Sequence, residues 1–273
     1  MALADQLDGL LIDLDGVVWI GRDPVPGSPE ALAALVEQGK EICFVTNNPS
    51  RPPERYAERL RKMGVEIGPE RIVTAGMVAA RLAGEAAGDG GAFVIGATAL
   101  KEMVAAAGPS VLEGEAGQEA RVVVVSGHRG FDYEELLTAK RALDGGAALV
   151  ATSHDPTMPM PGGEWPGTGA ILAAVETASG KRAEIGGKPE GHLFEMALDV
   201  ISRGSLRTDG DHKEPRDQRV AMVGDRIASD IDGGRAAGLA TVLVLSGAST
   251  RAEAEAAVPP PDHVVENLAA LLR

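Results

Sequence analysis

Short apolar runs alternate with helix-like segments along almost the whole chain of 273 residues. Strands are expected at residues 10–14, 41–46, 72–74, 93–95, 122–125, 148–152, 220–223 and 241–245. Helices are expected at residues 28–37, with Ser28 as N-cap, and at 53–63, 77–87, 100–107, 133–143, 169–178, 190–202, 230–237 and 267–272. This alternation is typical of parallel sheets with crossover helices. We therefore expect an α/β protein built on a Rossmann-like, doubly wound parallel sheet.

The strand–helix series breaks once, at the glycine-rich stretch 88–91, and then starts again. We interpret the middle third as a separate α/β cap domain inserted into the first one. The expected parts are residues 1–83 and 183–273 for the core and residues 84–182 for the cap domain. Residues 204–218 are polar and lack apolar periodicity, so an exposed loop is expected there.

The overall charge excludes one class of partner. A formal net charge of −14 argues against nucleic acid, because phosphate backbones require a basic protein surface. The single cysteine, Cys43, lies in an apolar run and is expected to be a buried small hydrophobe. The first residues lack the layout of a signal peptide, and the apolar runs are too short to span a bilayer. We expect a cytoplasmic protein without a membrane partner and leave a homodimer open.

The first strand ends in two carboxylates, Asp13 and Asp15, followed at once by Gly16. Unpaired charges near a core cost several kcal/mol, so a buried strand that ends this way needs a reason. Two neighbouring carboxylates are compatible when a cation or a shared proton compensates for their repulsion. Mg2+ is the usual hard cation beside phosphate. The alternative is that this stretch is only a turn, since Asp and Gly are common turn residues.

Polar residues also follow other strands at what is expected to be the same sheet edge. Thr46 and Asn47 end the second strand, and Asp225 ends a late strand, with Asp230 five residues further on. Lys188 lies in a Gly-Gly-Lys-Pro stretch that leads into a helix. Taken singly, Thr46-Asn47 is equally explained as a helix or turn cap, and Asp230 and Lys188 are better explained as a helix cap and a surface lysine. Ligands bind at the carboxyl edge of open parallel sheets, so together they predict a site.

This set of residues is suited to phosphoryl transfer. Asp13 is the candidate nucleophile on phosphorus, which splits hydrolysis into two steps through an aspartyl-phosphate. Asp15 is the candidate general acid and then base. Asp225 adds a carboxylate for Mg2+ beside Asp13. Lys188 and Thr46 offer a charge and a hydroxyl to the phosphate oxygens, stabilising the charge of the transition state.

The chain resembles the haloacid dehalogenase-like phosphatases over nearly its whole length. Any one of their motifs is weak, but four in the correct order are highly specific. The matching segments are Asp13-Leu14-Asp15-Gly16-Val17, Thr46-Asn47-Asn48, Gly187-Lys188-Pro189, and Gly224-Asp225-Arg226 with Ser229-Asp230.

The resemblance implies a role for each motif residue. The metal would be held by Asp13, by the backbone carbonyl of Asp15 and by Asp225, and Asp230 would lie in the second shell or act through water. Asn47 would join Thr46 and Lys188 in binding the substrate phosphate.

The long insertion resembles the α/β cap of the p-nitrophenyl phosphatase and phosphoglycolate phosphatase branch, through residues 155–159 and 166–171. Three differences from the usual pattern of this branch put the substrate in doubt. This chain has Thr152-Ser153 where the branch usually has Thr-Asn, and Ala228 where it often has Asp. It also has His128 where an acidic residue is frequent. The Asp-Pro-Thr stretch is similar to members that hydrolyse glycerol phosphate.

Ser153, His154 and Asp155 follow a predicted strand of the insertion, where a loop can recognise the rest of the substrate. His128 and His154 could contact a leaving group or could be surface residues.

The expected function is Mg2+-dependent hydrolysis of a small phosphorylated metabolite such as glycerol phosphate, phosphoglycolate or a sugar phosphate. The alternatives are a phosphomutase or phosphotransferase with the same intermediate, a nucleotide monophosphatase, and a catalytically idle sensor. The presence of Asp13, Asp15, Lys188 and Asp225 argues against the sensor.

Overall fold

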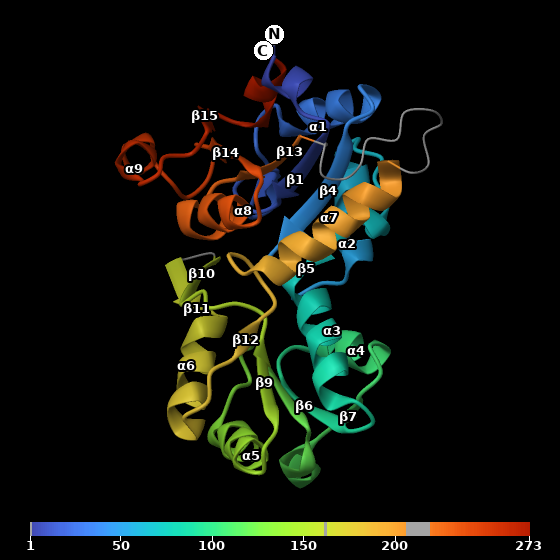
Figure 1. The fold of residues 1–273 in the computed structure, drawn as a ribbon, viewed down its shortest axis with the longest axis vertical. Helices are drawn as coiled ribbons and strands as arrows, with labels where there is room; N and C mark the ends of the chain where they lie inside the picture. The colour runs from blue at the N-terminus through green and yellow to red at the C-terminus, as the bar shows by residue number, and fades with distance from the viewer. Residues whose placement is uncertain (1, 161–162, 206–218) are drawn as a thin grey trace. The chain divides into compact units, whose positions relative to one another are not determined.

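Two parallel sheets form two compact units of the chain. The computed structural model describes residues 2–160, 163–205 and 219–273. By contacts among these residues, one unit, here called the core unit, comprises Met1–Thr46, Pro53–Val73 and Lys188–Arg273. The other, here called the inserted unit, comprises Asn47–Pro52 and Thr74–Gly187. The α/β fold with a second, inserted parallel sheet is confirmed (Figure 1). The domain limits at residues 84 and 182 stay a prediction.

The core sheet places the first strand of the chain at its centre. Its order is β15 (His263–Val265), β14 (Ala240–Val244), β13 (Val220–Gly224), β1 (Gly9–Asp13), β4 (Glu41–Thr46) and β5 (Ile72–Thr74). β1 pairs in parallel with β13 on one side and with β4 on the other. Every residue of β1 and β13 is buried, as expected for strands covered on both faces.

Helices cover both faces of the core sheet. Leu10 and Ile12 point to one face, where they join a cluster with α1 (Ser28–Glu37), α2 (Pro53–Lys62) and the 3-10 helix η6 (Leu268–Leu272). Gly9 points to the other face, where a Cβ would lie 3.3 Å from Ile201 of α7 (Gly191–Ser205). α8 (Asp232–Ala236) packs against β14. The smaller elements are η1 (Leu3–Gln6), β2 (Trp19–Ile20), β3 (Asp23–Pro24), η2 (Pro69–Arg71), the π-helix η5 (Ile227–Ile231) and α9 (Arg251–Ala256).

The inserted unit repeats this architecture with an entirely parallel sheet. Its strand order is β12 (Glu184–Ile185), β9 (Ala148–Ala151), β8 (Val122–Val125), β6 (Gly91–Ile95) and β7 (Ser110–Leu112). One face packs on α5 (Tyr133–Asp144) and α6 (Thr168–Ser179). The remaining elements are α3 (Ala75–Ala87), α4 (Thr98–Ala106), η3 (Gly114–Glu119) and the antiparallel pair β10 (Thr157–Met160) and β11 (Gly163–Pro166).

Several local expectations are wrong. Ser28 does not cap α1: the N-cap is Gly27, and the buried Ser28 hydroxyl donates to the Val17 carbonyl at 2.9 Å. The helix expected over residues 230–237 is divided into η5 and α8, because a π-turn brings Asp230 back toward β13. The expected loop 204–218 begins too early, since α7 continues through Ser205, and residues 206–218 lie outside the described residues.

Two expectations drawn from composition can be compared with the structure. Cys43 is free and fully buried, and burial raises the pKa of its thiol to about 12, which confirms a packing residue. Among the described residues, no helix combines the length and the apolar character needed to cross a membrane.

Candidate active site

The ends of three neighbouring core strands form the site. β1 ends at Asp13, β4 ends at Thr46, and β13 ends at Gly224, directly before Asp225. Parallel pairing sets the register, with Asp13 opposite Val45 of β4 and Ile12 opposite Val223 of β13. The strand ends therefore meet at one sheet edge, as expected. Thr46 is buried there.

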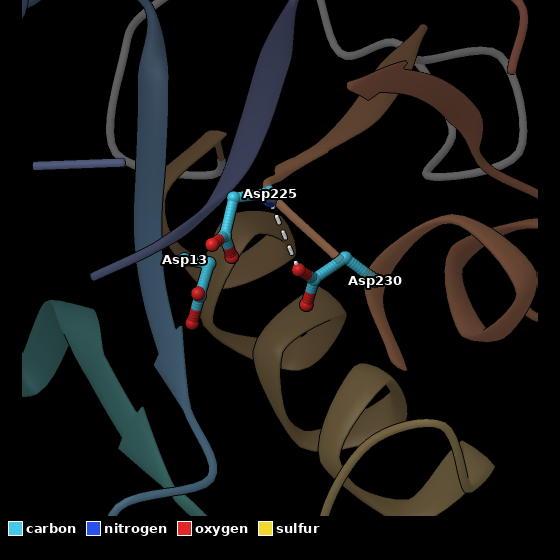
Figure 2. Close-up of side chains that lie close together, drawn as sticks. All are labelled: Asp13, Asp225 and Asp230. Carbon is cyan, nitrogen blue, oxygen red and sulfur yellow. Dashed lines mark hydrogen bonds between the residues drawn. The ribbon is translucent and has the colours of Figure 1, made fainter. Parts of the chain in front are cut away.

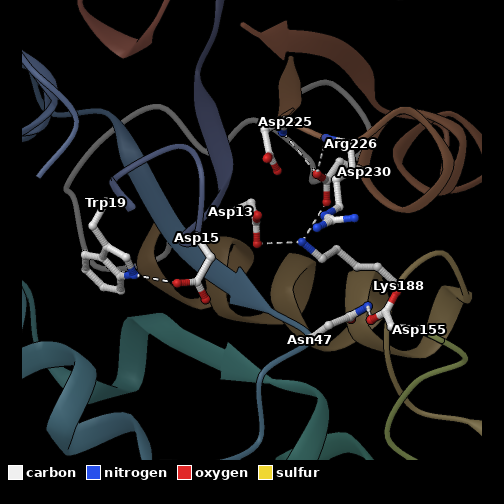
Figure 3. A network of polar contacts seen from close by, with 9 residues as sticks. All are labelled: Asp13, Asp15, Trp19, Asn47, Asp155, Lys188, Asp225, Arg226 and Asp230. Carbon is white, nitrogen blue, oxygen red and sulfur yellow. Dashed lines mark hydrogen bonds and ion pairs between the residues drawn. The ribbon is translucent and has the colours of Figure 1, made fainter. Parts of the chain in front are cut away.

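A buried lysine joins two of the acids. Lys188 Nζ donates to Asp13 Oδ1 at 2.7 Å and to Asp230 Oδ1 at 2.6 Å (Figure 3). Only 3% of Lys188 is exposed. Burial lowers the pKa of this ammonium, but the two carboxylates more than offset that, so its pKa is raised and the charge is retained.

Asp13, Asp225 and Asp230 form a buried carboxylate cluster (Figure 2). One carboxylate oxygen from each lies within 4.8 Å of the others. Burial, followed by the charge of Asp230, raises the pKa of Asp225 to about 6. Burial also raises the pKa of Asp13 well above its usual range, although Lys188 opposes the shift. Lys188 therefore compensates for only part of the negative charge that the cluster can carry.

The donor set fits a hard divalent cation. In the part of the chain that the structure describes, Asp225 Oδ1 is a buried oxygen without a hydrogen-bond partner. Two glycines leave room around this side chain. A Cβ on Gly16, whose φ is +89°, would lie 2.2 Å from Asp225 Oδ2, and one on Gly247 would lie 2.0 Å from it. Carboxylate oxygens are the ligands that Mg2+ prefers.

Asp230 differs from Asp225 because its two oxygens have partners. Its Oδ2 accepts hydrogen bonds from the backbone N–H groups of Asp225 at 3.1 Å and Arg226 at 3.0 Å, while Oδ1 accepts from Lys188. A Cβ on Gly224 would lie 2.4 Å from Oδ2, so the turn requires glycine there. Asp230 thus fixes the Asp225 loop and Lys188 to each other.

Asp15 lies apart from this cluster. Its Oδ1 accepts a hydrogen bond from Trp19 Nε1 at 2.9 Å, and the side chain is half-buried. In Figure 3, Asp13 lies between Asp15 and Lys188. A carboxylate and an ammonium therefore flank Asp13 on opposite sides in that view.

The remaining predicted residues belong to the inserted unit. Asn47 Nδ2 donates to Asp155 Oδ2 at 3.1 Å, and the Asp155 N–H donates to Ser153 Oγ at 3.3 Å. Ser153 is buried, whereas His154 is exposed. His128 Nε2 contacts Glu135 Oε2 at 2.9 Å. The structure therefore brings Asn47, Ser153 and Asp155 together.

The carboxyl edge of the inserted sheet carries hydroxyl groups. Thr152 Oγ1 donates to Ser126 Oγ at 3.0 Å and lies 3.4 Å from Thr168 Oγ1. Thr168 Oγ1 also accepts the Gly127 N–H at 3.0 Å. All three hydroxyl residues are buried, so this neutral network satisfies its own polar groups.

Sequence reasoning missed several residues that shape the site. Nothing in the sequence distinguishes Trp19 or Gly247, and Gly16 is noticeable only because it directly follows the acidic pair. Ser246 was also missed: its hydroxyl donates to the Gly16 carbonyl at 2.8 Å. The Ala248 N–H donates to Asp225 Oδ2 at 2.7 Å. No local motif identifies the Gly247 segment, because only the folded chain brings it to Asp225.

Comparisons with known proteins agree with this geometry. The family model described as haloacid dehalogenase-like hydrolase matches residues 10–110, and a second, described as HAD-hydrolase-like, matches residues 185–271. Chronophin from Mus musculus is 36% identical over 98% of this chain and 92% of its own length. Glycerol-3-phosphate phosphatase from Gallus gallus is 35% identical over 99% of this chain and 93% of its own.

A solved structure shows the same likeness in three dimensions. It is a glycerol phosphate phosphatase from Mycobacterium tuberculosis in complex with magnesium, 32% identical, with a TM-score of 0.85 over 99% of this chain and 78% of that one. The matches span the core strands that carry Asp13 and Asp225 as well as the inserted sheet. The chain therefore belongs to the haloacid dehalogenase-like hydrolases, and within that family it is a phosphatase, a phosphoric monoester hydrolase.

Proposed function

We propose that this phosphatase hydrolyses a small phosphomonoester through an aspartyl-phosphate on Asp13, with Mg2+ as cofactor. The observation that carries the proposal is the position of Asp13. It ends a central strand, with its Oδ1 2.7 Å from the ammonium of a buried lysine, and shares one buried cluster with Asp225, whose Oδ1 has no hydrogen-bond partner among the described residues.

In the first step, an Asp13 carboxylate oxygen attacks the phosphorus. The bond between phosphorus and the leaving oxygen breaks, and the leaving oxygen takes a proton from the Asp15 carboxyl group. The organic product departs as an alcohol. Lys188 and Thr46, with Asn47, bind the phosphate oxygens, whose charge is spread in the transition state.

In the second step, a water oxygen attacks the phosphorus of the aspartyl-phosphate. Asp15, now ionised, accepts the proton of that water. The bond between phosphorus and the Asp13 oxygen breaks, which releases inorganic phosphate and regenerates the Asp13 carboxylate. One residue thus serves as acid and then base, and both groups are ready for another turnover.

The carboxylates of Asp13 and Asp225, with the backbone carbonyl of Asp15, would hold Mg2+. When bound, the ion neutralises negative charge on the phosphoryl group and on its ligands. Asp230 would act from outside this set by holding the Asp225 backbone and Lys188. The unpartnered Asp225 oxygen supports this division of roles.

For the substrate, we propose a short polar phosphomonoester, with glycerol phosphate first and phosphoglycolate or a sugar phosphate next. The names of the chicken and mycobacterial relatives support glycerol phosphate. Ser153, His154 and Asp155 are proposed to recognise the organic part of the substrate. The hydrogen bond of Asp155 to Asn47, itself a proposed phosphate-binding residue, supports this role for the loop.

A substrate panel tests the proposal. Phosphate release from glycerol phosphate, phosphoglycolate, sugar phosphates, nucleoside monophosphates and p-nitrophenyl phosphate is measured with Mg2+ and with EDTA. Mg2+-dependent hydrolysis that is fastest on glycerol phosphate is expected. Transfer of phosphate within the substrate without release would instead indicate a mutase.

Replacement of all three loop residues by alanine tests the recognition step. The ranking of substrates in the panel should change while the Mg2+ requirement remains. An unchanged ranking would contradict a role for this loop.

A further inference from the structure

The indole of Trp19 is directed at the carboxylate of Asp15. Trp19 Nε1 donates to Asp15 Oδ1 at 2.9 Å (Figure 3). Only 1% of Trp19 is exposed, and a buried indole N–H normally finds a partner. In this chain the partner is a carboxylate two residues from Asp13, although a backbone carbonyl would satisfy the indole equally well.

The loop between the two residues is closed by its own backbone. The Gly16 backbone N–H donates to the Trp19 carbonyl at 2.7 Å, and the Trp19 backbone N–H donates to the Leu14 carbonyl at 3.2 Å. These bonds fix the distance between the two side chains before any substrate binds. The indole therefore reaches Asp15 from a rigid base.

The indole ring is held by α2. Tyr56 stacks parallel to it, with ring centroids 6.3 Å apart and an interplanar angle of 2°. Arg59, one turn further along the helix, places its guanidinium 3.9 Å from the indole centroid and donates to the Gly21 carbonyl at 2.8 Å. Cation–π contact and stacking both restrain the rotation of the ring. A hydrogen-bond donor is thus aimed at Asp15 by packing.

We propose that Trp19 is a positioning residue for proton transfer by Asp15. By binding Oδ1, the indole limits rotation of the carboxyl group and leaves Oδ2 for the leaving oxygen. Misplacement of a reacting group by about 1 Å can cost roughly 100-fold in rate. This inference rests on the proposed role of Asp15 as general acid. The competing explanation is that Trp19 only fills the core and that Asp15 merely satisfies its N–H.

The decisive variant is Trp19→Phe, which keeps an aromatic ring on Tyr56 and removes the N–H. The turnover number kcat is measured on glycerol phosphate, whose alcohol needs a proton to leave, and on p-nitrophenyl phosphate, whose phenolate does not. We expect a loss of about 10- to 100-fold on glycerol phosphate and of less than about threefold on the nitrophenyl ester. Equal losses on both substrates would overturn the inference.

A double-mutant cycle with Asp15→Asn separates positioning from packing. If Trp19 acts through Asp15, adding Trp19→Phe to Asp15→Asn should cause no further loss on glycerol phosphate. Losses that multiply would show that the indole acts independently of Asp15 and would overturn the inference.

Arg59→Met provides the same test if Trp19→Phe does not fold. Loosening the indole should lower kcat several-fold on glycerol phosphate but not on the nitrophenyl ester. The matched control is Arg55→Met on the same helix, whose side chain is exposed and pairs with Glu58. Equal effects of Arg59→Met and Arg55→Met would contradict positioning.

The single variant Asp15→Asn distinguishes a failure of the proposed acid role of Asp15 from a failure of the positioning role of Trp19. If its losses are equal on both substrates, the proposed acid role of Asp15 fails, and the inference fails with it. If Asp15→Asn is selective for glycerol phosphate and Trp19→Phe is not, the proposed function stands and only the positioning role is wrong.

Discussion

The two parallel sheets of this protein carry different chemistry at their carboxyl edges. In the core unit, β1 ends in Asp13 and β13 leads directly to Asp225, and the buried Lys188, shortly before α7, donates to Asp13. In the inserted unit, the corresponding edge carries the hydroxyls of Ser126 and Thr152. The backbone architecture is the same, with parallel strands and helical crossovers.

Because the two sheets share one architecture, the residues at their edges, and not the sheets themselves, determine the chemistry. Hydroxyl groups both donate and accept, so the inserted edge satisfies itself. Carboxylates only accept, and a single ammonium does not neutralise three of them. Burying such charges costs several kcal/mol each unless they are paired. The core edge therefore keeps negative charge that a bound cation would neutralise, whereas the hydroxyl groups of the inserted edge satisfy one another.

Removal of the nucleophile should impair the chemistry of the core edge most. Asp13→Asn should lower kcat on the order of 10⁴- to 10⁶-fold, because an amide oxygen does not attack phosphorus effectively. Phosphate release and acid-trapped phosphoenzyme are measured. Ser126→Ala at the corresponding edge of the inserted sheet is the control and should retain turnover. Substantial turnover by Asp13→Asn would refute the aspartyl-phosphate.

The next effect concerns the metal. Asp225→Asn should raise the Mg2+ concentration for half-maximal activity by at least about 10- to 100-fold, the range seen even for outer-shell partners. Titration of Mg2+ into EDTA-treated protein, with phosphate release as the readout, measures this half-maximal concentration. Asp262→Asn is a matched control, because that carboxylate lies outside the acidic cluster and accepts hydrogen bonds from the Thr241 N–H and hydroxyl groups. A normal Mg2+ requirement in Asp225→Asn would refute the proposed site.

The charge of the core edge also predicts a pH dependence. Burial raises the pKa of Asp225 to about 6, so between pH 4 and 6 the metal-free folded state binds more protons than the unfolded state. Stability of the metal-free protein should therefore fall as pH rises through this window. Mg2+ needs the ionised carboxylate, so its stabilisation should grow toward pH 7.5, reaching about 2.7 kcal/mol at 100 times Kd.

Thermal melts with and without Mg2+ at pH 5, 6 and 7.5 measure this dependence. Sulfate salts are avoided, since an anion at the phosphate site would obscure the metal effect. A stabilisation by Mg2+ that is the same at all three pH values would argue against ionisation of the cluster on binding.

The smallest expected effect lies in the inserted unit. Thr168→Val leaves the Gly127 N–H without its acceptor and should lower the free energy of unfolding by about 1–3 kcal/mol, without changing the Mg2+ requirement. Urea unfolding measures this free energy, and Thr177→Val on the exposed side of α6 is the control. An altered Mg2+ requirement would show that the two edges are not independent.

Much of the core could be predicted because strand ends are visible in the sequence. An apolar run that ends in Asp13 or Asp225 identifies both the strand and its polar edge. The glycine-rich context indicates Lys188 in the sequence, and in the structure its ammonium donates to Asp13 Oδ1. These residues lie where the chain changes from apolar to polar, which is a local signal.

The rest depends on contacts that are distant in sequence or on very short elements. β7 and β15 have three residues each, too few for a periodic pattern. Ser28 has the composition of a cap, but burial gives its hydroxyl a different partner. The space around Asp225 depends on Gly247, whose proximity arises only after β13 and β14 pair.

The strand order of the core sheet has a consequence for synthesis of the chain. β1 pairs with β13, and the partner of Ile12, Val223, is synthesised roughly 210 residues later in the chain. At about 5–20 residues per second, β13 leaves the ribosome roughly 10–40 s after β1. All strands of the inserted sheet, from β6 to β12, are made in this interval. The nascent protein can therefore complete its second sheet while its first strand is paired with β4 alone, and the acidic cluster forms only after Asp225 and Asp230 have been made.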